Sequence, residues 1–174
     1  ALLRRAVCGG YIPYHLMANR CARIDNPIGF PMKPSLIQPY LIFSGRCEEA
    51  LAFYQRAMGA QVDMLMYFHQ SPDPVPPGML QDGFESKVMH CQFRVGDTTI
   101  LASDGCDDKT VFSGFSLALS VPTEAEADRI FDALSQQGHV IMALTKTFWS
   151  PRYGMVKDQF GVQWMVMVPA EGPQ

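Results

Sequence analysis

His90 is the side chain best suited to move a proton or to orient a bound molecule. It lies in the stretch 88–95, which alternates in polarity as a β-strand does. The face expected to pack against a helix holds Met89, Cys91, Phe93 and Val95. The face expected to line a cleft holds Val88, His90, Gln92 and Arg94. An imidazole titrates near neutral pH, so His90 is either a general base, a ligand-orienting group or a hydrogen-bonded wall residue.

Alternation along the other strands predicts the rest of this cleft. In the last strand, Trp164, Val166 and Val168 are expected to face a helix, which leaves Gln163, Met165 and Met167 for the cleft. Ser116, Ala118 and Ser120 are expected beside them, with Leu41 and Phe43 opposite. Candidate ligand-binding residues are Phe43, Gln92, Ser103, Ser116, Trp149, Arg152 and Met165. A mostly apolar cavity with few polar groups suits a small organic molecule.

Trp149 and the cysteines are the other side chains that could take part in binding or chemistry. Trp149 lies in a loop that either folds over a ligand or packs at a dimer interface. Cys91 and Cys106 have no base placed near them, so nucleophilic catalysis is not predicted. The chain has five cysteines, an odd number without a C-x-x-C pair. This pattern is typical of a reducing compartment, and we expect a cytoplasmic protein.

The elements that position these residues occur twice. The first set is a strand over 38–44, a helix from Cys47 that stops at Gly59, a strand over 62–69 and a hairpin over 87–103. The second set is a strand over 115–121, a helix that opens with Thr123-x-x-Glu126 and stops at Gly138, a strand over 139–146 and a hairpin over 153–168. A proline-rich loop, 71–83, interrupts the first set. A shift of 77 positions superimposes the two sets.

Two tandem βαβββ modules are therefore predicted, in an α+β fold whose curled mixed sheet surrounds a cleft. The modules are expected at 34–104 and 105–174. The segment 1–33 is basic and has no clear period, so we interpret it as an N-terminal extension unrelated to function, or less plausibly a transit peptide. The net charge of -3 and the absence of a basic stripe argue against nucleic acid. No apolar run approaches the roughly 20 residues of a membrane helix.

This order of elements resembles the vicinal oxygen chelate superfamily of glyoxalase I, bleomycin-resistance proteins and extradiol dioxygenases. More narrowly, it is similar to the PhnB-like branch. The matching motifs are Pro39-Tyr40-Leu41, Phe43-Ser44-Gly45, Phe53-Tyr54, Ser113-Gly114-Phe115, Thr147-Phe148-Trp149 and 157–165, which reads KDQFGVQWM. The resemblance spans about 35–169 and implies the glyoxalase/bleomycin-resistance/dioxygenase fold.

Metalloenzymes of this superfamily take two His or Glu ligands from each module. The resemblance places these positions at Pro39, Ser116, Met165 and either Leu101 or Ser103. None of these side chains holds a catalytic zinc, nickel or iron, so no metal and no other cofactor is expected. The branch often carries a demethylubiquinone methyltransferase label. We do not expect that activity, because no Gly-rich loop follows a strand as a nucleotide-type cofactor would need.

We therefore predict a binding protein for a small apolar or aromatic molecule in a metal-free cleft. The alternative is a metal-free or atypical enzyme of lyase, isomerase or transferase type, in which His90 acts with Ser116 or Arg152. A metal-dependent glyoxalase or dioxygenase is the third hypothesis. The resemblance also implies a homodimer, with the modules paired either within one chain or across two.

Overall fold

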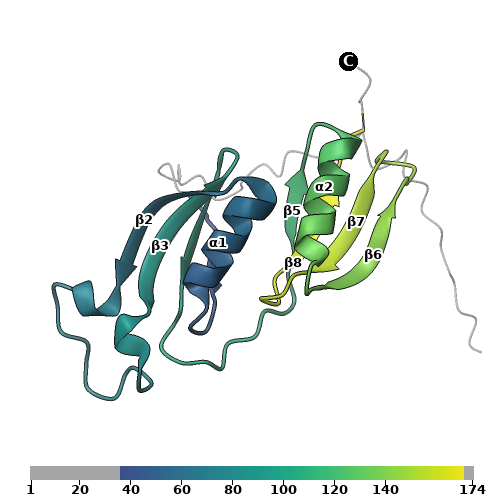
Figure 1. Ribbon diagram of the computed structural model, residues 1–174. Coiled ribbons are helices and arrows are strands. Elements are labelled where there is room, and N and C mark those ends of the chain that lie inside the picture. The colour runs from purple at the N-terminus through teal and green to yellow at the C-terminus, as the bar shows by residue number, and fades with distance from the viewer. Residues whose placement is uncertain (1–35, 171–174) are drawn as a thin grey trace, which may run out of the picture. The chain divides into compact units, whose positions relative to one another are not determined.

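The computed structural model describes residues 36–170 (Figure 1). Every described helix and strand belongs to one compact unit, residues 37–174. The predicted extension, 1–33, lies outside the described residues.

The first module contains one helix and four strands: β1 (Tyr40–Ile42), α1 (Cys47–Met58), β2 (Gln61–Tyr67), β3 (Val88–Val95) and β4 (Thr98–Ser103). Two short 3₁₀ helices flank its proline-rich loop: η2 (Phe68–Gln70) and η3 (Phe84–Ser86). The second module repeats the pattern: β5 (Leu117–Ser120), α2 (Glu124–Ser135), β6 (His139–Thr145), β7 (Tyr153–Lys157) and β8 (Gln163–Met167).

Each module forms its own four-stranded mixed sheet. The strand orders are β1-β4-β3-β2 and β5-β8-β7-β6, with only the β1–β4 and β5–β8 pairs parallel. In Figure 1, α1 and α2 each lie against the sheet of their own module. The predicted α+β fold of two βαβββ modules is therefore confirmed. We use the term open face for the side of each sheet that is turned away from its helix.

Local sequence signals explain both helices. At the end of α1, Gly59 adopts the left-handed conformation with φ 71°, as predicted. At the start of α2, the Thr123 hydroxyl accepts a hydrogen bond from the Glu126 amide at 3.2 Å. This helix ends at Ser135, three residues before the predicted stop at Gly138. Within residues 36–170, no helix has the length and apolar character needed to cross a membrane.

The internal repeat holds for the helices but not for the first strands. The offset of 77 pairs Ala50 with Ala127 and Tyr54 with Phe131, and all four are buried. In the strands, Leu41 is buried against the helix side, whereas its partner at that offset, Ala118, is exposed. Because side chains alternate in direction along a strand, the buried faces of the two first strands coincide only when the offset is one residue longer or shorter than the one that aligns the helices.

Asp158 joins the two modules. This carboxylate is 4% exposed and accepts four hydrogen bonds. Oδ1 accepts from the amides of Phe160 and Val162 at 2.9 and 3.0 Å, which fixes the turn between β7 and β8. Oδ2 accepts from the Trp164 indole at 2.9 Å and from the Tyr54 hydroxyl, on α1, at 2.7 Å. One side chain thus holds the second module's hairpin against the first module's helix.

Aromatic packing reinforces this junction. The Phe160 ring makes edge contacts with Phe43, Phe53 and Tyr54, with centroid distances of 6.0, 5.7 and 6.2 Å. The Arg46 guanidinium lies 4.5 Å above the Phe160 ring centroid. One hydrophobic core therefore includes buried residues from both modules.

Replacing the carboxylate should destabilise the fold strongly. We expect Asp158→Ala to lower the free energy of unfolding by roughly 4 kcal/mol, because it leaves the Tyr54 hydroxyl, the Trp164 indole and two amides without an acceptor. Asp97→Ala, in the exposed turn between β3 and β4, is the matched control and should change stability by less than about 0.5 kcal/mol. Chemical denaturation measures both. Equal effects of the two substitutions would contradict the role of Asp158.

Candidate functional site

The open face of the first module presents the side chains expected of a binding surface. Cys91 and Phe93 are fully buried on the helix side of β3, and the Phe93 ring stacks on Tyr54 at 6.0 Å. His90, Gln92 and Arg94 are partly exposed, consistent with the predicted alternation onto the open face.

Two details of this alternation differ from the prediction. The register of β2 against β3 jumps from His90 to Val88, so Met89 forms a β-bulge. Val88 is consequently buried on the helix side, and Met89 joins the open face. The predicted facing of β1 is also wrong. Leu41 and Phe43 pack in the core, 1% and 4% exposed, and their neighbours Tyr40 and Ile42 occupy the open face.

His90 has a polar partner that the sequence analysis did not identify. Its Nδ1 lies 3.2 Å from the hydroxyl oxygen of Tyr40, on β1. The two rings are also stacked, with centroids 5.7 Å apart and planes inclined by 27°. Neither Ser116 nor Arg152 makes a hydrogen bond to His90 in the described part of the chain. The imidazole is thus oriented by a phenol within its own module.

An open pocket of about 440 Å³ lies between this face and the proline-rich loop. We call it the loop pocket. Its walls are mostly apolar, and they come from the sheet, the proline-rich loop and the loop after β4. The lining residues are Tyr40, Ile42, Phe68, Ser71, Asp73, Pro74, Val75, Pro76, Met79, Met89, Ser103, Gly105 and Cys106. Of the predicted site residues, only Ser103 lines the loop pocket, and His90 reaches it through Tyr40.

Hydrogen bonds hold the two loops of the pocket together. The Gln81 amide donates to the Cys106 carbonyl at 2.9 Å, and the Gln81 side chain accepts from the Asp108 amide at 3.3 Å. Between Pro74 and Met79, the only backbone hydrogen bond found in the described chain is the local one from Met79 to Pro76. The outer wall of the pocket is therefore tied at its ends and weakly held in the middle.

Asp104 lies between two residues that line the pocket, Ser103 and Gly105. This carboxylate is 1% exposed; Oδ1 accepts from the Cys47 amide at 2.6 Å and Oδ2 from the Val88 amide at 2.8 Å. It connects the end of β4, the start of α1 and the start of β3. Burial raises the pKa of Asp104 above its ordinary value, although the two amides oppose this shift.

The opposite end of this face is polar. The Arg94 guanidinium forms two hydrogen bonds with the Asp63 carboxylate, at 2.8 and 3.0 Å, and one with the Gln61 side chain at 3.0 Å. The hydrogen bonds from Arg94 lower the pKa of Asp63. Gln92 lies between this polar group and His90 along β3, so polarity increases along the strand from the loop pocket to Arg94.

Site residues predicted in the second module lie in other surroundings. Ser116 and Met165 border a shallow hollow of about 400 Å³ together with Gln163. The Trp149 ring packs edge-on against Tyr153, with centroids 4.5 Å apart. Arg152 is held by Asp128, on α2, through contacts of 2.6 and 2.7 Å. None of these residues lines the loop pocket.

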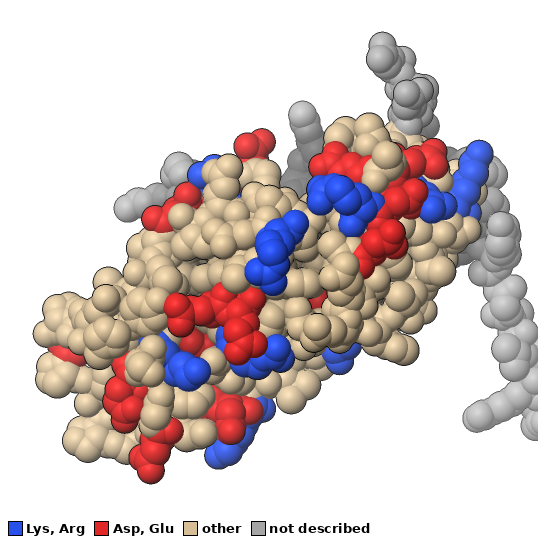
Figure 2. Space-filling view, viewed as in Figure 1, with Lys and Arg blue, Asp and Glu red and all other residues tan. Residues whose placement is uncertain are grey.

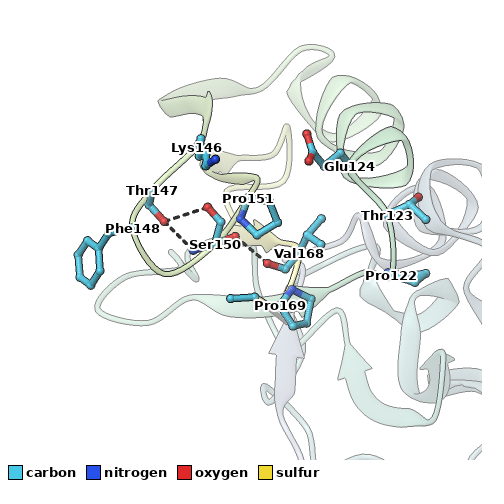
Figure 3. Close-up of a pocket in the computed structure, with 11 residues that line it drawn as sticks. Pro122, Thr123, Glu124, Lys146, Thr147, Phe148, Ser150, Pro151, Val168 and Pro169 are labelled. Carbon is cyan, nitrogen blue, oxygen red and sulfur yellow. Dashed lines mark hydrogen bonds between the residues drawn. The ribbon is translucent and has the colours of Figure 1, made fainter. Parts of the chain in front are cut away.

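A larger hollow, about 550 Å³, lies beside the start of α2 (Figure 3). It contains none of the predicted site residues. The hydroxyl groups of Ser150 and Thr147 are engaged with the backbone: Ser150 donates to the Val168 carbonyl at 2.7 Å, and Thr147 to the Ser150 carbonyl at 3.2 Å. Figure 3 shows Phe148 pointing away from the other lining residues. Charged side chains, Glu124 and Lys146, also line this hollow, so it suits an apolar ligand less well than the loop pocket does.

The residues do not fit a divalent metal ion. The resemblance places the superfamily's ligand positions at Pro39, Ser116, Met165 and either Leu101 or Ser103, and none of these side chains supplies an imidazole or a carboxylate. In the described chain, no three His, Cys, Asp or Glu side chains come together as a metal-binding group. Cys47 and Cys91 are buried free thiols, with sulfur atoms 3.7 Å apart. The Cys91 thiol and burial together raise the pKa of Cys47, which makes it a poor nucleophile.

Comparisons with known proteins support the fold and the branch. Residues 35–167 match the family described as 3-demethylubiquinone-9 3-methyltransferase. The chain is 34% identical over 145 residues to Protein YjdN of Escherichia coli, which covers 79% of this chain and 97% of YjdN. Protein PA1353 of Pseudomonas aeruginosa has a similar structure, with 37% identity, a TM-score of 0.68 and coverage of 78% of this chain and 98% of PA1353. A Bacillus cereus structure, titled a putative 3-demethylubiquinone-9 3-methyltransferase, PhnB protein, is 25% identical with a TM-score of 0.64, covering 77% and 99%.

The raised pKa of Asp104 predicts a pH dependence of stability. The folded protein binds this proton more tightly than the unfolded chain does. The group's contribution to the free energy of unfolding is therefore complete below about pH 4 and is lost as the pH rises through the folded-state pKa. We expect the stability difference between the wild type and Asp104→Asn to shrink with rising pH, as measured by denaturation at a series of pH values. A difference that grows with pH would show that the pKa is lowered instead.

Proposed function

Because the chain belongs to the PhnB-like family of the vicinal oxygen chelate superfamily, we propose that it binds a small apolar or aromatic molecule in the loop pocket without a metal ion. The loop pocket is the observation that carries this proposal. It has mostly apolar walls and a volume within the range of small-molecule sites, and Tyr40, whose hydroxyl pairs with His90, lines its sheet side.

The chemistry of the walls supports an apolar ligand. Met79 is 52% exposed at the outer wall, and Met89 lies on the sheet side. Methionine side chains adapt to irregular apolar shapes and make favourable contacts with aromatic rings. The weakly held span from Pro74 to Met79 allows the wall to adjust around a ligand.

An enzyme that uses His90 is the second candidate, and the hydrogen bond with Tyr40 favours it. A phenol that orients an imidazole is an arrangement that can support proton transfer. Catalysis would require turnover that His90→Ala abolishes while binding persists. We do not propose methyl transfer, since the chain lacks the Gly-rich loop of a nucleotide-type cofactor site.

We also propose that two copies associate. Both outer edge strands expose apolar side chains: Met64 and Leu65 on β2 are 38% and 36% exposed, and Val140 and Ile141 on β6 are 42% and 44% exposed. Edge strands of this kind favour pairing with another chain. The charged groups on the surface seen in Figure 2 are of mixed sign, which does not oppose self-association. The unlinked thiols Cys47 and Cys91 are consistent with the proposed cytoplasmic location.

Met89→Gln tests the proposed pocket. This substitution keeps the length of the side chain but places an amide in the apolar wall, so binding of the fluorescent probe N-phenyl-1-naphthylamine should weaken about tenfold, or 1.4 kcal/mol. Met142→Gln, on β6 and outside the loop pocket, is the matched control and should bind the probe like the wild type. Fluorescence titration measures both affinities. Equal affinity of the two variants would exclude the loop pocket as the binding site.

Ile141→Lys tests the proposed self-association. A lysine on the exposed edge of β6 should weaken the dimer at least tenfold, because association would bury its charge. Val111→Lys, in an exposed loop, is the control and should leave the dimer intact. Sedimentation analysis over a concentration series measures the dissociation constants. A wild-type protein that remains monomeric throughout would rule out the proposed dimer.

A further inference from the structure

The Tyr40–His90 pair has a geometry that bears on which ligand the loop pocket selects. The Tyr40 ring is 48% exposed and lines the pocket, while its hydroxyl lies 3.2 Å from His90 Nδ1. The stacked rings hold the imidazole in one orientation. Tyr40 therefore presents one side to the pocket and uses its hydroxyl to position His90.

The direction of this hydrogen bond determines whether the other ring nitrogen of His90, Nε2, is a donor or an acceptor. A phenol is a good donor, and the unprotonated nitrogen of a neutral imidazole is a strong acceptor, so we expect the Tyr40 O–H to donate to Nδ1. The imidazole proton must then reside on Nε2, since the bond made by one ring nitrogen sets the state of the other. His90 consequently presents an N–H donor.

The described surroundings do not use this donor. Within residues 36–170, the only side-chain hydrogen bond of His90 is the one to Tyr40. The residue opposite His90 on β2 is Met66, which has no strong acceptor. Arg94 and Asp63, further along the same face, are paired with each other. His90 is only partly exposed, so an acceptor atom on a bound molecule can replace solvent at this N–H.

We propose that the ligand is an apolar or aromatic molecule that extends from the loop pocket past the exposed Tyr40 ring to His90, which lies outside the pocket lining, and that it carries an acceptor oxygen to which His90 Nε2 donates. His90 is then the specificity-determining contact, and Tyr40 is a positioning residue that fixes the imidazole tautomer. This inference rests on the proposed function, because it assumes that the loop pocket binds a ligand.

Two probes of nearly equal size distinguish the contribution of a hydrogen-bond acceptor to binding from the contribution of apolar contact. The ketone of 2-acetylnaphthalene accepts a hydrogen bond, whereas 2-ethylnaphthalene has no acceptor. The wild type should bind the ketone about tenfold more tightly. His90→Phe keeps an aromatic ring beside Tyr40 and should reduce this preference below about twofold, with the affinity for 2-ethylnaphthalene little changed. His90→Gln, whose amide can donate from a similar position, should restore part of the preference.

Tyr40→Phe tests whether the Tyr40 hydroxyl sets the tautomer of His90, a property that a loss of packing alone would not change. Nitrogen NMR of histidine-labelled protein distinguishes the two tautomers of a neutral imidazole. We expect the Nε2–H form in the wild type and a mixture of tautomers in Tyr40→Phe. Predominance of the Nδ1–H form in the wild type would overturn the inference without any ligand.

The outcomes separate this inference from the proposed function. Failure of both probes to bind the wild type would refute both. Equal binding of the two probes, with the affinity of each reduced by Met89→Gln, would leave the loop pocket in place and overturn the acceptor preference. A preference for the ketone that persists in His90→Phe would assign the donor to another residue.

Discussion

The structure depends most on the hydrogen bonds of one buried carboxylate, Asp158. A charged group is costly to bury unless it is fully paired, and four donors surround this one. Burial still raises its pKa, which indicates that desolvation exceeds the favourable hydrogen bonds. The donors come from α1, the β7–β8 turn and β8. The hydrogen bonds that join the two modules therefore form only at the desolvation cost of burying this carboxylate. Phe160, two residues further along, fills the space between them with an aromatic ring.

Joining the modules through their helix sides has a functional consequence. The apolar faces of α1 and α2 are buried in the shared core, and each sheet packs against only one of these helices. The other face of each sheet therefore remains open. In the first module, the proline-rich loop covers part of this face and creates the loop pocket. Asp104 plays a role there similar to that of Asp158, since it pins three segments with one carboxylate. The rigid sheet and the weakly held loop together form a site with one fixed wall and one adaptable wall.

Much of this architecture could be predicted from the sequence. The buried face of α1 could be predicted because small and apolar residues such as Ala50 and Tyr54 recur at helical spacing. Its end could be predicted because Gly59 readily adopts the left-handed conformation that terminates a helix. The facing of β8 was correct because Trp164 and Val166 alternate with less buried residues.

The errors have equally local causes. Every position from Pro39 to Phe43 is apolar, so β1 gave no alternation from which to choose its buried side. The bulge at Met89 inserts one residue and reverses the facing of Val88, which no periodicity reveals. Tyr40 was missed as the partner of His90 because 50 residues separate them, and only the parallel pairing of β1 with β4 brings them together. The pocket residues of the proline-rich loop depend on tertiary packing alone.

The central claim is that a small apolar molecule occupies the loop pocket, between the first module's sheet and the proline-rich loop. Methyl NMR of methionine-labelled protein during a titration with 2-acetylnaphthalene tests it most directly. We expect saturable shifts of the Met79 and Met89 signals, on opposite walls of the pocket, while the signal of Met142, on β6, stays in place. Saturable shifts confined to Met155 or Met165, in the second module, or no saturable shift at all, would contradict this account.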